Sequence, residues 1–577
     1  RRRNQKSRVD TIPKKNKVMN KIKILRNKLK QYNIDGYVVP KNDDYFTEYS
    51  KINRLKIISN FSGSAGLAII LKNKNYLFTD GRYTIQSQIE CGKNFKIIDN
   101  EKLINCNLFK NLTLGIDPKL FTYKQINKFF LKLNKVKFIN ENLIDQIEKF
   151  KVNDTHPFFH LNKNIVGESQ NSKLNKISRY LKKNNSDFLF ISAPENVAWT
   201  LNIRGKDGPN TPMPNTRLIV SKTKKIYLIA NKIKCKKLIN QKIINSNQII
   251  ALNEILKLKG DNFIIDENTC SIYFENLIKS KFKIKKKEDP IYYFKSIKNK
   301  TEISHMIKSH ISDGVALTKF LYWMKNTNKK QITEVQAQNK LEKFRKKNKN
   351  YLYPSFDTIA GTGKNGAIVH YRAKPDDCRI IRKKDIFLCD SGGQYKYGTT
   401  DVTRTLCFSQ QSQNIKNIFT KVLKGHIAVA TTDLKKDNIG KKIDIRARKF
   451  LKKSNLDYAH GTGHGVGFFL NVHEGPQSIS KINKVKIKEG MILSNEPGFY
   501  KKNKFGIRIE NLVYVKRQNK RLFFENLTTA PIEKDLINFN LLTNFEKNYL
   551  FKYHLNVYSK ISKYLNSNEK KWLASLI

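Results

Sequence analysis

Acidic residues are scarce in this sequence. The 577 residues include 48 Asp and Glu against 111 Lys and Arg, so the formal net charge is +63. This imbalance is compatible with binding to a nucleic acid, an anionic membrane surface or an acidic partner. The lysines, however, are spread along the whole chain, whereas nucleic-acid proteins concentrate basic residues in a patch or tail. We interpret the charge as compositional drift and expect no specific nucleic-acid partner.

Long apolar runs and paired cysteines are also missing. No stretch approaches the roughly 18 apolar residues of a membrane span, so we expect no membrane association. The seven cysteines form no CxxC pair, and such an odd, unpatterned set is typical of reduced thiols in a reducing compartment. Residues 1–18 are basic but lack the apolar stretch of a signal peptide. We interpret them as an extension that precedes a start at Met19, and we expect a cytoplasmic protein.

The first half of the chain contains two stretches with the same order of predicted elements. Each has a helical pattern, then a buried strand, then a hairpin; the helical patterns are KIKILRNKLKQYN and KLNKISRYLKKNN. This repetition predicts two related α/β domains, over residues 19–160 and 161–297. The sequence VNDTHPFFHLNKN, rich in Asn and Asp, has the character of a linker between them.

Residues 298–577 predict an α+β domain that holds all the recognisable chemistry. Its first helix follows KSIKNK, and Thr301 is placed to cap its start. The segments DIFLCD and TTDVTRTLCF are predicted as strands. Two glycine-rich segments, GTGKNG at 361–366 and HGTGHGVG, lack the helix or the GK[ST] of a phosphate-binding loop and lead into strand-like sequence. We expect these glycines to let the backbone pass close to a metal site.

Five residues of this domain are candidate metal ligands. Asp390 ends one predicted strand and Asp401 lies in the next, a spacing that lets a hairpin bring both carboxylates to one side. The others are His464, Glu496 and Glu510. Four carboxylates and one imidazole suit divalent ions such as Mn²⁺, Co²⁺ or Zn²⁺. Because four negative charges in one pocket repel one another, two metal ions are a reasonable count.

Each candidate taken singly has an ordinary structural explanation. An Asp at a strand end is commonly a turn former, and a lone His is commonly a core residue with its hydrogen bonds satisfied. The two glutamates could be paired with the abundant lysines. The combination of the five is what indicates a metal site.

Five segments of the third domain resemble those of the Xaa-Pro aminopeptidases, members of the pita-bread metallopeptidase superfamily: AIVHYRA, DSGGQYKYGTTDVTRT, HGTGHGVGFFLNVHEGP, SNEPGFY and FGIRIEN. The resemblance is to the eukaryotic cytosolic, three-domain type. It extends to FSGSAG and TDGRY in the first domain, to WTLNIRG in the second and to the C-terminal tail. It implies two creatinase-N-like α/β domains followed by a pita-bread α+β catalytic domain, residues 298–577.

The resemblance also implies a role for each ligand. Asp401 and Glu510 would bridge two metal ions, usually Mn²⁺, Asp390 would complete one ion, and His464 and Glu496 would complete the other. A hydroxide held between two cations is a strong nucleophile at neutral pH. Glu496 can take a proton from the water and pass it to the leaving nitrogen.

Further residues match family positions around the substrate. His370 and His473 resemble histidines that contact the substrate and stabilise the developing oxyanion. His460 matches another pocket histidine, and a hydrogen bond that fixes its loop explains it equally well. Arg508 and Tyr500 match positions that brace Asp390, as a guanidinium beside a carboxylate would.

The predicted function is hydrolysis of the N-terminal Xaa-Pro bond of peptides by a metalloaminopeptidase. The first alternative is an Xaa-Pro dipeptidase, or prolidase, which uses the same ligands; the duplicated N-terminal half and the long tail argue against it. The second is a pita-bread binding module for nucleic acid or protein, but such modules have typically lost metal ligands. The resemblance further implies a homodimer formed through the catalytic domain.

Overall fold

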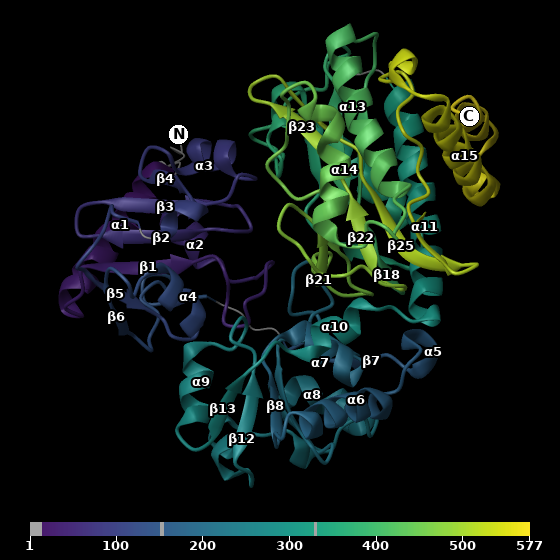
Figure 1. Ribbon diagram of the computed structural model, residues 1–577. Coiled ribbons are helices and arrows are strands. Elements are labelled where there is room, and N and C mark those ends of the chain that lie inside the picture. Colours follow the sequence, from purple (N-terminus) through teal and green to yellow (C-terminus); the bar gives the residue numbers. More distant parts are fainter. Residues whose placement is uncertain (1–13, 105, 151–154, 328–331) are drawn as a thin grey trace, which may run out of the picture. The chain divides into compact units, whose positions relative to one another are not determined.

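The computed structural model describes residues 14–104, 106–150, 155–327 and 332–577 (Figure 1). The chain forms two compact units, residues 1–153 with 267–280 and residues 154–266 with 281–577. Residues 1–13 of the predicted extension lie outside the described residues, and the first helix, α1 (Lys14–Gln31), already spans Met19. The domain boundaries taken from the sequence stay a prediction.

The first unit contains a six-stranded sheet in the order β4-β3-β2-β1-β5-β6. Its strands are β1 (Gly36–Pro40), β2 (Leu67–Leu71), β3 (Asn75–Thr79), β4 (Lys96–Asp99), β5 (Thr113–Ile116) and β6 (Lys135–Phe138). Its helices are α1, α2 (Arg54–Ser59), α3 (Thr84–Cys91), α4 (Tyr123–Phe129) and, from later in the chain, α9 (Ile272–Lys279). Ile22, Leu25 and Leu29 recur at helical spacing along α1 and are fully buried.

The second unit begins with a five-stranded sheet in the order β11-β10-β8-β12-β13. Its strands are β8 (Phe188–Ile191), β10 (Arg217–Ser221), β11 (Ile226–Ile229), β12 (Asn262–Ile265) and β13 (Lys283–Lys286). The short strands β7 (Phe159–His160) and β9 (Ile203–Arg204) pair with each other. The helices here are α5 (Lys163–Val166), α6 (Gln170–Lys183), α7 (Pro194–Leu201), α8 (Lys232–Asn240) and α10 (Pro290–Ser296).

The two sheets share a topology. In the first, β1 pairs antiparallel with β2 of a hairpin and parallel with β5. In the second, β8 pairs antiparallel with β10 of a hairpin and parallel with β12. Each predicted sequence repeat therefore folds into the same arrangement of strands, and the first sheet adds β4.

The long helix α11 (Lys300–Asn326) opens the third region. Its N-cap is Asn299, so the prediction that Thr301 caps it is wrong. The Asn299 side chain accepts hydrogen bonds from the backbone N–H groups of Thr301 and Glu302, and the Glu302 side chain accepts from Asn299 in return. This capping box places Thr301 inside the first helical turn.

The largest sheet of this region has five strands in the order β21-β20-β22-β25-β26. They are β20 (Gly463–Gly465), β21 (Glu474–Ile479), β22 (Ile492–Asn495), β25 (Asn511–Gln518) and β26 (Arg521–Asn526). One face packs against α13 (Gln413–Ala430) and α14 (Gly440–Lys452), in a core that includes Val429, Ile443, Leu493 and Val513. The other face packs against α11, through Met306, Ile492 and Leu512 (Figure 1). Alternate residues of β22 and β25 thus point to opposite layers, as the strand period requires.

The remaining strands form small sheets around the candidate ligands. They are β14 (Tyr351–Pro354), β15 (Ile359–Thr362), β16 (Phe387–Ser391), β17 (Gly393–Tyr395), β18 (Gly398–Thr399), β19 (Val402–Leu406), β23 (Gly498–Lys501) and β24 (Phe505–Arg508). The remaining helices are α12 (Glu334–Lys346), α15 (Asn544–Ile561) and α16 (Ser567–Ala574). Residues Gly363–Ala367, most of the first glycine-rich segment, form a short 3₁₀ helix, and a turn at 368–370 follows where the sequence predicted a strand. Mixed layers of helices and sheets agree with the predicted α/β and α+β class.

The structure can be compared with two expectations from the sequence, namely that no segment spans a membrane and that the cysteines are reduced. None of the helices in that part of the chain is both long and apolar enough to cross a bilayer. All seven cysteines are free thiols, six of them buried and Cys378 half-buried.

Candidate metal centre

Strand pairing brings three candidate carboxylates together. Asp390 of β16 lies opposite Thr403 of β19, and Asp401 precedes Thr403 by two positions, so both aspartates belong to one face. Thr403 also forms a bridge with Glu510, and its hydroxyl donates to Glu510 Oε2 at 2.6 Å. The prediction from the sequence was that Asp401 lies inside the strand that follows Asp390. Instead β17 and β18 intervene, and Asp401 immediately precedes β19.

His464 lies in β20, and Glu496 directly follows the neighbouring strand β22. The backbone N–H of His464 donates to the Ser494 hydroxyl at 2.9 Å, and that hydroxyl donates to Glu496 Oε1 at 3.0 Å. A side chain at Gly463 would place its Cβ 2.0 Å from the carbonyl oxygen of Ser494. Glycine is therefore required at Gly463 for the two strands to approach, as expected for this segment.

The side chains of Asp401, His464 and Glu510 offer one ligand atom each within 4.8 Å of one another. His464 Nε2 lies 3.3 Å from Asp401 Oδ2 and 3.4 Å from Glu496 Oε1. His464 Nδ1 lies 2.8 Å from the carbonyl oxygen of Gly465 and can only donate there, so Nε2 is the ring nitrogen that remains available to a metal ion.

The electrostatics of the cluster favour cations. Burial lowers the pKa of His464, but the hydrogen bond to Asp401 and the charge of Glu496 outweigh it and raise the pKa to about 9. Burial raises the pKa of Glu510 well above its usual range, and the charges of Asp401 and Glu496 raise it further. Carboxylates packed this closely in a buried site require protons or cations among them, and a pair of divalent ions meets that requirement at neutral pH.

Asp390 provides the clearest test of whether a metal fits. Its Oδ2 accepts from Arg508 at 2.7 Å, whereas its Oδ1 is buried and has no hydrogen-bond partner among the described residues. Burial raises the pKa of Asp390 to about 6, with Arg508 opposing and Asp401 adding to the shift. An unpartnered carboxylate oxygen that shares a strand face with Asp401 fits a metal ligand, and an oxygen-rich donor set with one imidazole suits a divalent ion.

Arg508 begins a chain of hydrogen bonds through Tyr500 to His460. Arg508 donates to the Tyr500 hydroxyl at 2.6 Å, and His460 Nε2 lies 2.8 Å from the same oxygen. His460 Nδ1 lies 2.7 Å from the carbonyl oxygen of Gly461 and donates there, so Nε2 accepts from the hydroxyl. This network supports the loop-fixing explanation of His460 and places Tyr500 behind Arg508 rather than against Asp390.

The two remaining histidines flank the cluster. The His473 ring lies edge-on to His464, with 4.3 Å between ring centroids. His370 follows Val369, whose carbonyl oxygen lies 3.5 Å from an Arg508 nitrogen. The described hydrogen bonds thus tie the His370 turn to the guanidinium that also holds Asp390.

Glu334 is a residue of this region that no pattern in the sequence identified. Its fully buried carboxylate accepts from the backbone of Thr362 and Arg379 at 2.7 and 2.9 Å. It also accepts from the Tyr371 hydroxyl at 2.7 Å and from the Asn365 amide at 3.0 Å. One carboxylate thereby fixes the segment that carries His370. Its donors are 28 to 45 residues away, and no local motif marks such an arrangement.

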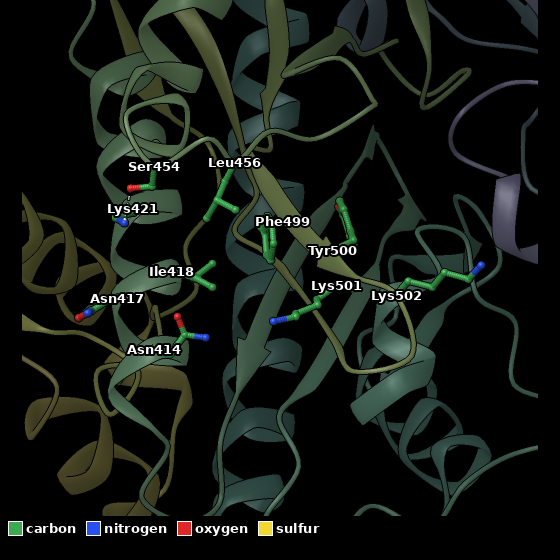
Figure 2. A pocket seen from close by; sticks show the side chains of 10 residues that line it. All are labelled: Asn414, Asn417, Ile418, Lys421, Ser454, Leu456, Phe499, Tyr500, Lys501 and Lys502. Carbon is green, nitrogen blue, oxygen red and sulfur yellow. Dashed lines mark hydrogen bonds between the residues drawn. The ribbon is translucent and has the colours of Figure 1, made fainter.

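A cavity of about 510 Å³ lies beside Tyr500. Figure 2 shows Ile418, Leu456 and Phe499 turned toward one another in it, with the Lys501 side chain near the same wall. Of the ten lining residues, Tyr500 is the one that takes part in the Arg508 network. The cavity is therefore lined by residues other than the five candidate ligands.

Models of known protein families match nearly the whole chain. The model of metallopeptidase family M24 matches residues 304–517, and the model of its C-terminal region matches 520–576. Two creatinase/prolidase N-terminal domain models match residues 21–147 and 151–302. These matches agree with two creatinase-type α/β domains followed by a pita-bread domain.

Individual relatives share this full length. Xaa-Pro aminopeptidase 1 of Dictyostelium discoideum is 36% identical, over 98% of both chains. A probable Xaa-Pro aminopeptidase P of Laccaria bicolor is 36% identical, over 95% of this chain and 91% of that one.

Solved structures extend the comparison. X-prolyl aminopeptidase of Caenorhabditis elegans, described as a cytosolic enzyme with a di-nuclear active site, superposes with a TM-score of 0.88 and 28% identity, over 97% of this chain and 99% of that one. A prolidase of Pyrococcus horikoshii matches with a TM-score of 0.52 and 25% identity, over only 63% of this chain but 99% of its own.

Proposed function

Because this chain belongs to metallopeptidase family M24 and is an Xaa-Pro aminopeptidase, we propose that five side chains hold the two metal ions of its active site: Asp390, Asp401, His464, Glu496 and Glu510. Asp401 and Glu510 would be shared by both ions, Asp390 would hold one ion, and His464 with Glu496 would hold the other. The observation that carries this assignment is the cluster of His464 Nε2 and carboxylate oxygens, in which ligand atoms of Asp401, His464 and Glu510 lie within 4.8 Å of one another.

The chemistry divides between the metals and the protein. When bound, the ions polarise the scissile carbonyl group and lower the pKa of water. Glu496 then accepts the proton of the attacking water and delivers it to the proline nitrogen, which leaves. The Ser494 hydroxyl, bonded to Glu496 Oε1 at 3.0 Å, holds that carboxylate in place for both transfers.

His370 and His473 are proposed to act on the substrate. Each can donate an N–H to the carbonyl oxygen as negative charge develops there, which lowers the barrier because the donor is already oriented. His473 lies against the ligand His464, and this position supports the assignment. His460 contributes to the substrate pocket through the Tyr500 hydroxyl that it fixes.

The substrate is a peptide with a free N-terminus and proline in second place. An Xaa-Pro bond has no N–H and a fixed φ near −65°, so the enzyme must recognise the pyrrolidine ring without an amide hydrogen. The carboxylate-rich centre offers a counter-charge for the free α-amine. A prolidase of similar catalytic fold spans only 63% of this chain, whereas an X-prolyl aminopeptidase matches 97% of it, and this difference favours an aminopeptidase over a prolidase.

We further propose Mn²⁺ as the metal, a cytoplasmic location and a homodimer. Mn²⁺ is consistent with four carboxylates and one imidazole. The free cysteines support a reducing compartment, and the Caenorhabditis elegans relative is described as cytosolic. The dimer is inferred from the family resemblance.

Metal removal and reconstitution test the proposal. The protein is dialysed against a chelator, Mn²⁺, Co²⁺ or Zn²⁺ is added back in steps, and metal content and Xaa-Pro-Xaa cleavage are followed together. We expect activity to vanish with the metal and to return as two ions per chain bind. Full cleavage by metal-free protein would contradict the proposal.

A further inference from the structure

The loop between β20 and β21, residues 466–473, carries His473; it is called the His473 loop below. Near its start, the loop is bound by Arg204 of β9, which comes from the part of the chain that precedes α11. Arg204 Nε donates to the Phe469 carbonyl oxygen at 2.6 Å, and a terminal nitrogen donates to that of Phe468 at 3.0 Å. The fork of the guanidinium thus holds two successive carbonyl groups of this loop.

The backbone that Arg204 holds has an uncommon conformation. Phe469 has a φ of +46°, in the left-handed region that a bulky residue rarely adopts. Such a conformation persists only where surrounding contacts enforce it. Arg204 is itself buried, and its described hydrogen bonds all go to backbone carbonyl groups. Four hydrogen bonds to carbonyl groups offset the cost of burying this guanidinium, and two of them go to the His473 loop.

The other end of the loop is bound by two lysines. Glu474 directly follows His473, and its side chain is 1% exposed. Lys295 of α10 donates to Glu474 Oε2 at 2.8 Å, and Lys298, between α10 and α11, donates to Oε1. Two buried ammonium groups share one carboxylate, and burial lowers the pKa of Lys298 while Glu474 opposes that shift. An apolar core would be less costly here, so the arrangement favours a defined position over stability.

We propose that Arg204, Lys295 and Lys298 are positioning residues for His473. Arg204 fixes the loop a few residues before His473, and the lysines fix the residue directly after it. The ring between these points is held against His464, with 4.3 Å between centroids. The α/β region that precedes α11 thereby shapes the catalytic site without contacting the reacting atoms. This inference rests on the proposed substrate role of His473.

The test is a double-mutant cycle on kcat with the peptide Arg-Pro-Pro. Arg204→Lys keeps the charge but cannot hold both carbonyl groups. Since a displacement of about 1 Å can reduce a rate by up to about 10²-fold, we expect kcat to fall about tenfold or more, with metal content unchanged. In a His473→Ala background the same substitution should change kcat by less than about twofold, because the group that it positions is gone.

Lys295→Met tests the opposite end of the loop. It leaves Glu474 paired with Lys298 alone and should reproduce the pattern of Arg204→Lys, so the test stands even if one variant folds poorly. Lys325→Met is the matched control, because Lys325 pairs with the buried Glu533 at 2.8 Å, away from the His473 loop. We expect the control to lose thermal stability as Lys295→Met does and to keep its kcat.

Two results would overturn the inference. One is an equal fold loss of kcat in the native and His473→Ala backgrounds, as a general loss of stability would produce. The other is native kcat in folded, metal-loaded Arg204→Lys and Lys295→Met proteins. Failure of the proposed function would appear separately, as absent metal or absent Xaa-Pro cleavage in the unsubstituted protein.

Discussion

The imidazole of His464 faces the carboxylate of Asp401, with 3.3 Å between Nε2 and Oδ2. Nδ1 of the same ring donates to a backbone carbonyl oxygen, so the Nε2 lone pair is directed at the carboxylates. A lone pair that faces anions is stable only when a proton or a metal cation lies between them. The relationship supports the proposed role of His464 as a metal ligand, with Asp401 Oδ2 at 3.3 Å and Glu496 Oε1 at 3.4 Å from Nε2.

Asp401→Ala should remove both metal ions, because we assign Asp401 as a bridging ligand. Elemental analysis is expected to show a loss of both ions and the peptidase assay no turnover. Asp385→Ala is the control, since Asp385 pairs with Arg379 and is no candidate ligand. Two retained ions per chain in Asp401→Ala would contradict the bridging assignment.

The histidines should separate into two classes. His464→Ala is expected to lower metal content, whereas His473→Ala should keep two ions and lower kcat by ~10²-fold, the scale of a lost oxyanion donor. Parallel elemental analysis and kinetics on the two variants distinguish the roles. Metal loss in His473→Ala with retention in His464→Ala would reverse the assignment.

The Glu334 carboxylate should be required to hold the His370 segment. Glu334→Gln replaces an acceptor by an amide that faces N–H donors, and we expect about 1–3 kcal/mol less stability and a lower kcat. Tyr371→Phe removes a single donor at 2.7 Å and should cost about 0.5–1.5 kcal/mol. Denaturant unfolding and steady-state kinetics measure both effects. A Glu334→Gln protein with native stability and native kcat would show that this network is dispensable.

Stability should fall in acid partly through His554. His554 Nε2 accepts from the Ile532 backbone N–H at 3.0 Å, and burial together with nearby Arg404 lowers the pKa of His554 from 6.5 to about 4. The folded protein therefore binds fewer protons than the unfolded chain between these values. The contribution of His554 to the free energy of unfolding is complete above pH 6.5 and is lost as the pH falls through 4. The total loss is up to about 3 kcal/mol.

His554→Gln checks this sign, because a glutamine oxygen can still accept from Ile532 but does not titrate. Unfolding free energies at several pH values between 7 and 4 should decline less in His554→Gln than in the unsubstituted protein. His156→Gln, at an exposed position, serves as the control. If the unfolding free energy of His554→Gln depended on pH as that of the unsubstituted protein does, His554 would not cause the acid destabilisation.

Local patterns in the sequence were sufficient for the fold class and for the repeated helix, strand and hairpin, because these depend on hydrophobic periodicity. The capping residue of α11 was misassigned, because Asn299 and Thr301 both carry suitable oxygens and only the backbone conformation selects between them. The contacts of Glu334 and Arg204 could not be predicted from the sequence, because they join residues that are far apart in the chain. Arg204 reaches Phe469 across 265 positions, and such a bond depends on the tertiary fold alone.

Peptide selectivity tests the central claim most directly. We compare kcat/KM for Arg-Pro-Pro, its N-acetyl form, Arg-Ala-Pro and the dipeptide Arg-Pro. The account predicts that Arg-Pro-Pro is the best substrate, because it alone combines a free α-amine, proline in second place and a residue beyond it. A clear preference for Arg-Pro would make the protein a prolidase, and equal rates on Arg-Ala-Pro would contradict the requirement for proline.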